Sequence, residues 1–406
     1  MRRKLLTLLA VAVVAGGMTQ TAFATNGDDM IGVSPVSRAM GGIGVGMPIC
    51  ATDALYRNPA WMSKSKNFEV SFGSTLFMPD VKITATMGNA TLADETSKAD
   101  TFVIPEFAIT QRLSDKLVLG VGAFGVSGMG TDYRNANDPA GVLQSTNTNF
   151  SFMRMMPGIS YQLTDNIALG AAVHMTWGSL DMGQGFSQDF GIGASLGLSY
   201  ETNMFTAGFS YMSPVKMTYK RVYDSNGDGT FEDMKLEQPQ EVAAGVGVRP
   251  IDGLKVGFDV RWINWAGADG YKQFGWNNQV VYALGAEYQA TEALTLRAGF
   301  NYAKSPLDDY TATAASFAPS VNIPDFAVPF PEYNVAALNA LGFPAITETH
   351  LTLGAGYKFT KHFAVNVAYV HAFEGDFKVE DTTGLAPTYE AKNSQDSVSM
   401  GLHWNF

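Results

Sequence analysis

Cysteine is nearly missing from this chain of 406 residues, because Cys50 is the only one. A lone cysteine forms no intramolecular disulfide, so the fold carries no covalent cross-link. No lipobox precedes Cys50, which argues against a lipid anchor, and a buried small side chain is its simplest role. Packing and hydrogen bonds alone must therefore hold the structure together.

Charged residues are also scarce, at 16% of the chain, and their acidic excess gives a net charge of −11. An average soluble domain carries about 25% charged residues. Nucleic-acid binding depends on clustered Lys and Arg, so this acidity argues against a nucleic-acid partner. The chain is rich instead in glycine, with 42 residues, and in aromatic residues, at 12%.

Long apolar runs are missing after the first residues. Residues 1–24 begin with a basic stretch (2–4), continue with an apolar run of eleven residues (5–15) and end in an A-x-A cleavage site (22–24). This pattern predicts a signal peptide, and the run is too short to cross a bilayer as a helix. Loss of the three basic residues would change the net charge from −11 to −14 in the exported chain.

Apolar and polar residues alternate along most of the remaining sequence, as they do in half-buried β-strands. In 254–262, leucine, valine and phenylalanine share one face, while Lys255, Asp259 and Arg261 share the other. A membrane protein without an apolar helix is typically a closed barrel. We therefore predict an all-β fold, a 14-stranded antiparallel transmembrane β-barrel over residues 67–406. Its strands lie near 67–78, 101–111, 117–127, 150–161, 166–177, 188–200, 203–213, 239–249, 253–264, 277–289, 293–303, 347–359, 362–373 and 396–406.

Short polar turns alternate with longer, irregular connections between these strands. This asymmetry is typical of barrels in the bacterial outer membrane, whose short turns face the periplasm. An even number of strands returns the C-terminus to the periplasmic side, where the chain ends in the aromatic Phe406.

Residues 25–66 show no alternation and are rich in glycine. A short helix capped by Thr52 or Asp53 must end near Asn58, because Pro59 pushes the residue before it out of the helical region. Small residues and short turns predict a plug, or hatch, folded inside the barrel. A disordered periplasmic tail is the alternative, and it would expose the apolar side chains of Leu55, Tyr56, Trp61 and Met62.

A signal peptide, a glycine-rich hatch ending in Asn58, Pro59 and Ala60, and fourteen strands together resemble the FadL-type long-chain fatty-acid transporters of the outer membrane. Three segments carry the likeness, namely 51–60 (ATDALYRNPA) in the hatch and the strand segments 297–306 and 343–354. The resemblance implies a monomer that takes up long-chain fatty acids, or aromatic and aliphatic hydrocarbons. It also implies capture at the outer surface, transfer into the lumen and sideways exit beside a kinked third strand.

The third predicted strand, within 117–130, supports such an exit independently. Its alternation fails after Ala123, and it carries Gly125, Gly128 and Gly130. Glycine inside a strand commonly marks a bulge or a bend. We predict a lateral opening at these three glycines, with an ordinary glycine-rich strand as the alternative.

Strand parity selects Phe124, Arg154 and Met156 as candidates for a ligand-lining wall. Arg154 can pair with the carboxylate of a fatty acid, since an inward-facing cation is costly unless it is matched. A structural ion pair with a neighbouring acid, such as Glu106 or Glu287, accounts for Arg154 equally well.

The segment 306–344 is long for a loop and contains six prolines together with many apolar residues. We predict a short helix over 335–341 and a contact surface for an apolar ligand. Inward packing and contact with lipopolysaccharide or outer-membrane lipid are the alternatives.

One loop resembles the first half of a calcium-binding loop, with glycine at its sixth position. Lys235 stands at the twelfth position, where such loops carry a bidentate Glu, so we expect only weak Ca²⁺ binding, with a plain turn as the alternative. No other cofactor is expected. The candidate ligands at alternate positions are Asp224, Asn226, Asp228, Thr230 and Glu232.

We do not expect an enzyme. Residues 193–197 fit the G-x-S-x-G pattern, but that motif needs a strand-turn-helix context, and here it lies within a predicted strand. The sequence predicts passive uptake of a hydrophobic compound across the outer membrane. A general diffusion porin or a purely structural barrel is the main alternative, and an outer-membrane lipid hydrolase is a third.

Overall fold

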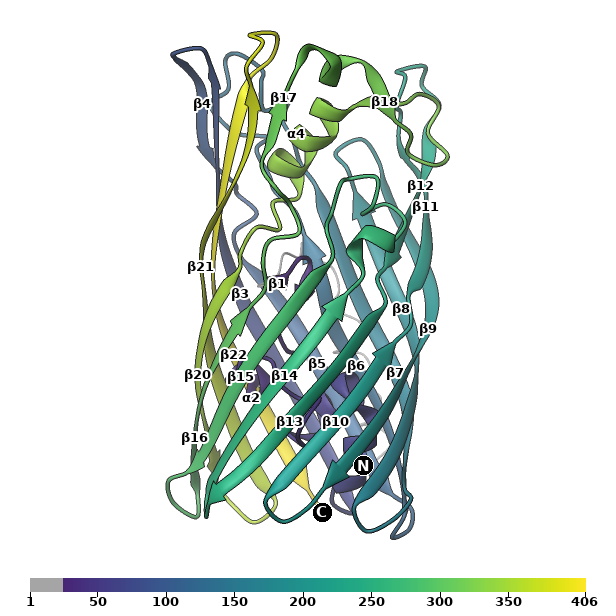
Figure 1. Cartoon of the computed structure of the whole chain (residues 1–406), viewed down its shortest axis with the longest axis vertical. Helices are drawn as coiled ribbons and strands as arrows, with labels where there is room; N and C mark the ends of the chain where they lie inside the picture. The colour runs from purple at the N-terminus through teal and green to yellow at the C-terminus, as the bar shows by residue number, and fades with distance from the viewer. Residues whose placement is uncertain (1–24) are drawn as a thin grey trace, which may run out of the picture.

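The computed structural model describes residues 25–406, so the predicted signal peptide lies outside the described residues. Fourteen antiparallel strands close into a barrel (Figure 1). The first strand of the ring, β3 (Phe68–Met87), pairs with the last, β22 (Thr388–Asn405). All fourteen predicted strands are present. The other twelve are β5 (Phe102–Arg112), β6 (Leu117–Met129), β7 (Asn149–Gln162), β8 (Ile167–Asp181), β9 (Phe186–Glu201), β10 (Phe205–Met212), β13 (Glu241–Ile251), β14 (Leu254–Ile263), β15 (Gln279–Gln289), β16 (Leu294–Tyr302), β20 (Thr349–Lys358) and β21 (Phe363–Asp381).

Closure of the ring removes the unpaired edge that an open sheet would present to lipid. Side chains alternate between the two faces as the sequence predicts. On β9, Leu196 and Leu198 are exposed on the outside, whereas Ser195 and Ser199 are buried in the lumen. Among residues 25–406, no helix is long and apolar enough to span a membrane.

Three strands extend beyond their predicted ends at residues 78, 373 and 396. β3 continues to Met87 and β21 to Asp381, and β22 begins at Thr388. The alternation continues in these extensions, but the outward side chains become charged, as in the cross-strand pair of Lys82 and Lys392. The predicted strands end too early because they are recognised by apolar residues on the outward face. Two short strands add to the wall, since β4 (Ala90–Thr96) pairs with β3 and β17 (Tyr310–Ala312) pairs with β21. The strands β11 (Val215–Tyr223) and β12 (Glu232–Gln238) form a separate two-stranded hairpin.

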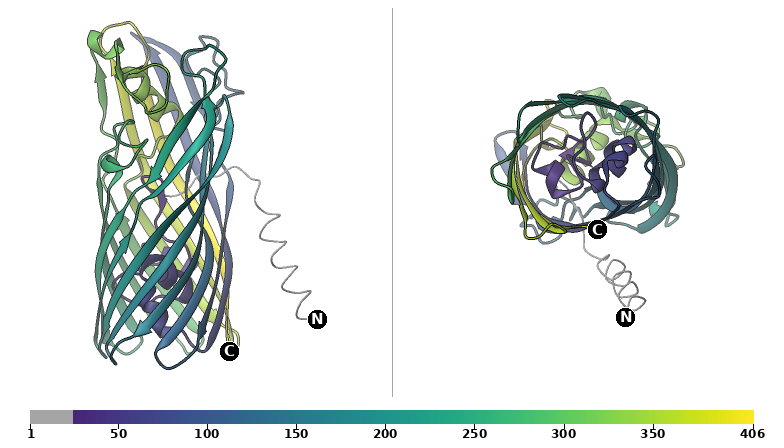
Figure 2. Two further views of the ribbon diagram at one scale, coloured as in Figure 1. Left: turned by 90° about the vertical axis from the view of Figure 1, so that its right-hand side faces the viewer. Right: turned by 90° about the horizontal axis from the view of Figure 1, so that it is seen from below.

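Residues 25–66 fold inside the barrel, as the view from below shows (Figure 2). Almost all of their side chains are buried. The fold therefore includes the hatch that the sequence predicts. Its elements are β1 (Thr25–Asn26), β2 (Asp29–Met30), α2 (Pro35–Arg38), α3 (Ala51–Arg57) and the 3₁₀ helix η1 (Pro59–Lys64).

The helix α3 ends before Pro59, as predicted, but the predicted cap is wrong. Its N-cap residue is Cys50, and not Thr52 or Asp53. The carboxylate of Asp53 instead accepts hydrogen bonds from the amide and the hydroxyl of Ser34. The side chain of Asp53, which the local pattern assigned to the helix cap, is therefore engaged in a contact with another part of the hatch.

The hatch backbone lies directly against the inner wall where the wall carries glycine. A Cβ atom on Gly208 would lie 1.8 Å from the carbonyl oxygen of Val45. One on Gly299 would lie 2.2 Å from the amide nitrogen of Gly41. Contacts this short exclude any side chain, so the inward glycines allow the hatch backbone to reach the wall.

Asp259 on β14 anchors one turn of the hatch. Its buried carboxylate accepts hydrogen bonds from the amides of Gly44 and Val45, at 2.7 Å each, and of Gly46, at 2.8 Å. Three amides around one carboxylate form an anion-binding nest, in which the hydrogen bonds are strengthened by the charge.

The predicted hatch residues Asn58, Pro59 and Ala60 lie at a second junction. Asn58 Nδ2 donates to the carbonyl oxygens of Val45, at 3.0 Å, and Leu198, at 3.1 Å. Its Oδ1 accepts from the amide of Ala60 at 3.1 Å. Asn58 therefore ties two parts of the hatch to each other and to β9.

Replacement of Asp259 tests whether this anchor keeps the hatch in place. Asp259→Asn puts an amide, with two donors of its own, where three donors converge on a carboxylate. Charge-assisted hydrogen bonds contribute about 1.5–3 kcal/mol each, and neighbouring ones are not additive. We therefore expect the free energy that holds the hatch in the barrel to fall by about 3 kcal/mol. Ion conductance in planar bilayers should rise. Asp252→Asn, in the exposed turn before β14, is the control, and equal conductance of all three proteins would contradict the anchoring role.

Candidate functional site

The connection between β16 and β20 covers the end of the barrel opposite the C-terminus (Figure 1). We call this segment, residues 306–344, the lid. The predicted short helix is present as α4, and its Tyr333, Val335, Ala340 and Leu341 are buried, so the lid packs inward. Besides β17, the lid contains η3 (Ala314–Phe317), β18 (Pro319–Val321), β19 (Phe330–Pro331) and α4 (Glu332–Gly342).

Buried hydrogen bonds hold the lid on the barrel. Asn339 Nδ2 donates to the carbonyl oxygen of Phe274 at 2.8 Å, and the indole Nε1 of Trp276 donates to Asn339 Oδ1 at 3.3 Å. The hydroxyls of Thr131 and Thr148 donate to the last two carbonyl groups of α4, at 2.6 and 2.7 Å. These hydroxyls satisfy helix-end carbonyls that would otherwise lack partners.

Two cavities lie beneath the lid, and Met182 and Phe274 line both of them. The outer cavity has a volume of about 170 Å³, and the inner pocket is only about 20 Å³. In the described part of the chain, no Lys, Arg, Asp or Glu lines either cavity. The outer cavity includes Tyr223, Phe326, Phe330, Tyr333, Leu338 and Tyr389, and the inner pocket includes Met129, Phe150, Leu180, Met234, Leu236 and Tyr271.

Tyr271 connects the inner pocket to the hatch. Its hydroxyl donates to the carboxylate of Asp28, and Gln238 Nε2 donates to the same hydroxyl at 3.5 Å. Gln238 Oε1 accepts from the guanidinium of Arg154 at 3.1 Å. Burial raises the pKa of Asp28 to about 7, although the hydrogen bond from Tyr271 acts in the opposite direction.

Arg154 faces the lumen, as strand parity predicts, and is 1% exposed. Within residues 25–406 it forms no ion pair with Glu106 or Glu287, so neither of these two acids is its partner. Glu287 pairs with Lys255 and Arg297 instead, at 2.8 Å each.

Phe124 and Met156 also face inward and are fully buried. The ring of Phe124 meets the ring of Tyr56 edge-on, with centroids 6.0 Å apart, so it packs against the hatch. None of the three predicted wall residues lines either cavity. The sequence does not identify the lining residues outside the lid. Several of them lie in loops or in the β11–β12 hairpin, where no alternation of apolar and polar residues shows which side chains face inward.

The wall is discontinuous between β5 and β6. Their backbone pairing runs from Arg112↔Val118 to Glu106↔Phe124 and goes no further in the described part of the chain. β5 nevertheless continues to Phe102, where it pairs only with β3. The part of β6 that follows Phe124 therefore has no partner from β5.

The hatch pairs with β6 beyond that point. The register of β6 against β7 shifts between Gly125 and Ser127. Ser127 then pairs with Asp29 of β2, and the amide of Gly128 donates to the carbonyl oxygen of Asp28 at 3.2 Å. The bulge and the change of partner fall within the predicted glycine stretch.

Gly130 follows the end of β6 directly. A Cβ atom there would lie 2.3 Å from the carbonyl oxygen of Thr148, so the chain turns too closely past its neighbour for a side chain. An apolar cluster fills the inner side of the gap: Met30 of the hatch packs with Phe77, Phe102 and Ile104, and each is 3% exposed or less.

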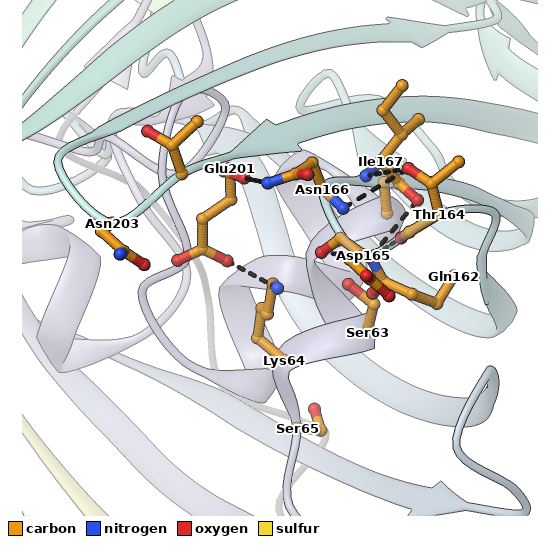
Figure 3. A network of polar contacts seen from close by, with 12 residues as sticks. Ser63, Lys64, Ser65, Gln162, Thr164, Asp165, Asn166, Ile167, Glu201 and Asn203 are labelled. Atoms are coloured by element: carbon orange, nitrogen blue, oxygen red, sulfur yellow. Dashed lines mark hydrogen bonds and ion pairs between the residues drawn. The ribbon is translucent and has the colours of Figure 1, made fainter.

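A polar network lies at the periplasmic end of the hatch (Figure 3). Lys64, the last residue of η1, forms an ion pair with Glu201 at 2.6 Å. Asn166 Nδ2 donates to the carbonyl oxygen of Glu201 at 2.6 Å. Partly exposed ion pairs contribute little energy, so this network orients the hatch more than it holds it. A third cavity, of about 330 Å³, lies at this end and differs from the other two in having charged walls, with Lys255 and Arg297 among them.

The candidate calcium loop forms the tip of the β11–β12 hairpin. Asp224 accepts hydrogen bonds from the amides of Gly227 and Gly229, at 2.7 and 2.8 Å, and Asp228 accepts from that of Thr230 at 2.7 Å. Asn226 and Glu232 are engaged in the same way, within the turn. Residues 25–406 contain no group of three or more His, Cys, Asp or Glu side chains placed to hold a metal. Calcium binding stays a prediction.

Asn339→Ala should loosen the lid, because it leaves the Trp276 indole and the Phe274 carbonyl without their partner. An unsatisfied buried polar group costs about 1–3 kcal/mol, which corresponds to about a ten-fold faster dissociation of a ligand held under the lid. Dissociation of naphthalene from the purified protein, followed by its own fluorescence, measures this rate. Asn322→Ala, at an exposed amide of the lid that lines neither cavity, is the matched control. Equal rates in both variants would show that Asn339 does not retain the lid.

The sequence matches the model of the family described as "Outer membrane protein transport protein (OMPP1/FadL/TodX)" over residues 11–187 and 179–319. A comparison with curated proteins finds no match.

The fold is similar to that of solved transporters over almost the whole chain. The P. putida toluene transporter TodX gives a TM-score of 0.67 at 20% identity, and the match covers 92% of this chain and 99% of that chain. A Pseudomonas aeruginosa FadL homologue gives 0.71 at 15% identity, covering 94% and 100%. The Ralstonia pickettii toluene transporter TbuX gives 0.64 at 20% identity, covering 92% and 98%.

Proposed function

This chain belongs to the outer membrane transport protein family (OMPP1/FadL/TodX), and from that premise we propose that it takes up hydrophobic compounds passively and releases them sideways between β5 and β6. It is a β-barrel of the bacterial outer membrane. The compound enters under the lid, occupies the outer cavity and the inner pocket, and leaves beside the hatch strand β2.

The observation that carries this proposal is the loss of pairing between β5 and β6, at the point where β2 takes over as the partner of β6. An apolar solute gains free energy by leaving water, so a sideways exit into an apolar layer suits it better than an aqueous channel. The apolar cluster around Met30 lines the inner side of this exit.

A general diffusion pore fits the lumen less well, because the hatch backbone touches the wall at Gly208 and Gly299. A lipid hydrolase has less support still. Ser195, the candidate nucleophile, is 1% exposed and lies within the straight strand β9, facing the lumen.

Deletion of Val126 tests the sideways exit. Val126 is the extra residue that shifts β6 against β7, and without it β6 can stay in register and continue to pair with β5. Uptake of a labelled hydrophobic compound by cells should fall to background. Binding of naphthalene to the purified protein should persist, because Val126 lines neither cavity.

Val126→Ala keeps the extra residue and should transport like the wild type. Migration of the folded barrel in unheated gels checks that both variants are assembled. Full uptake by the deletion variant would exclude an exit at this gap.

A further inference from the structure

The polar atoms around the inner pocket are already engaged with protein partners. The hydroxyl of Tyr271 donates to Asp28, and the indole N–H of Trp276 donates to Asn339 at 3.3 Å. The Asn339 amide in turn donates to the carbonyl oxygen of Phe274 at 2.8 Å. A ligand that enters this pocket gains apolar contacts, and a polar head group would have to compete for groups that are bonded elsewhere.

Charge is missing from the walls of both upper cavities. No Lys, Arg, Asp or Glu of residues 25–406 lines the outer cavity or the inner pocket. Burial of a carboxylate without a matched cation is strongly unfavourable. An ionised head group therefore has no compensating partner in either cavity.

Arg154 does not supply the missing cation. It is 1% exposed, and its terminal nitrogens contact Gln238 at 3.1 Å and the sulfur of Met212 at 2.7 Å. Gln238 and Tyr271 lie between Arg154 and the inner pocket. A carboxylate could reach the guanidinium only by displacing both.

The β11–β12 hairpin beside the outer cavity carries charges of both signs, among them Lys220 and Arg221. Tyr223, which lines this cavity, stacks on Phe326 with ring centroids 5.7 Å apart. Asp224, Asp228 and Glu232 follow in the hairpin tip that Tyr223 begins. None of these charged residues lines the cavity itself, so they offer an ionised head group no partner inside it.

The volume of the outer cavity also limits the ligand. At about 170 Å³ it is close to the apolar cavity of about 150 Å³ that holds benzene. A compact ring compound fits this space with the lid in place, whereas a long acyl chain would extend beyond it.

We infer that this transporter selects uncharged, compact hydrophobic compounds, such as aromatic hydrocarbons, and excludes carboxylates, including ionised fatty acids. The inference rests on the proposed uptake function and narrows its substrate class. Selectivity arises from the absence of charged residues in the walls of both upper cavities and from the prior engagement of the polar groups around the inner pocket. Arg154 is linked to the hatch through Gln238 and Tyr271, whose hydroxyl donates to Asp28.

Binding to the full-length mature protein in nanodiscs tests this selectivity with naphthalene, 2-naphthoate and dodecanoate as probes. The first two share one ring system and differ by a carboxylate. At neutral pH the wild type should bind naphthalene at least about ten-fold more tightly than either acid. At a pH below the carboxyl pKa, 2-naphthoic acid becomes neutral and should approach naphthalene. Equal affinity for naphthalene and 2-naphthoate at neutral pH would overturn the inference.

Met234→Lys adds the cation that the site lacks, since Met234 lines the inner pocket and is 2% exposed. It should raise the affinity for 2-naphthoate by about ten-fold or more and weaken naphthalene binding, while Met234→Leu should behave as the wild type. An unchanged preference in Met234→Lys would count against the inference. If that variant fails to assemble, the pH dependence of the wild type decides alone. Uptake by the Val126 deletion variant reports separately on the exit, so the two proposals can fail independently.

Discussion

The structure depends on contact between the backbone of the hatch and a wall of inward glycines. Where Gly208 faces Val45 and Gly299 faces Gly41, no side chain separates the two backbones. Three backbone amides of the hatch find their partner in the wall at the nest around Asp259. Close packing of this kind obstructs the axis of the barrel through residues 25–66, and a solute that passes needs another way out.

The hatch also serves as part of the wall. A barrel in lipid tolerates no unpaired strand edge, yet β5 and β6 separate above Glu106↔Phe124. The hatch strand β2 supplies a partner for β6 from the inside, through Asp29↔Ser127. Met30, on the same strand, covers the gap with an apolar side chain. One short segment thus closes both the axial route and the lateral one.

The sequence predicts the barrel well because lipid and lumen impose opposite preferences on successive side chains, which also places Arg154 inside. Beyond the part of the barrel that contacts lipid, the outward residues are no longer apolar. The end of β3 and the start of β22 carry charged outward residues such as Lys82 and Lys392. The candidate site could not be assembled from local patterns. Tyr271 and Asp28 are 243 residues apart in the chain, and Arg154 and Gln238 are 84 apart. Such pairings depend on barrel closure and on the position of the hatch inside the barrel. Neither can be predicted from a short stretch of sequence.

Asp28 joins the two ends of the proposed route. Its carboxylate accepts a hydrogen bond from Tyr271, which lines the inner pocket, and its carbonyl oxygen accepts from Gly128 beside the gap. A ligand that displaces Tyr271 therefore acts on the residue that holds β2 against β6, without a long chain of intermediate contacts. The inner pocket holds only about 20 Å³ of free volume, so occupation by any hydrocarbon requires its walls to move. Because the walls offer apolar contacts in place of charge, the work of moving Tyr271 must come from the burial of the ligand's own apolar surface.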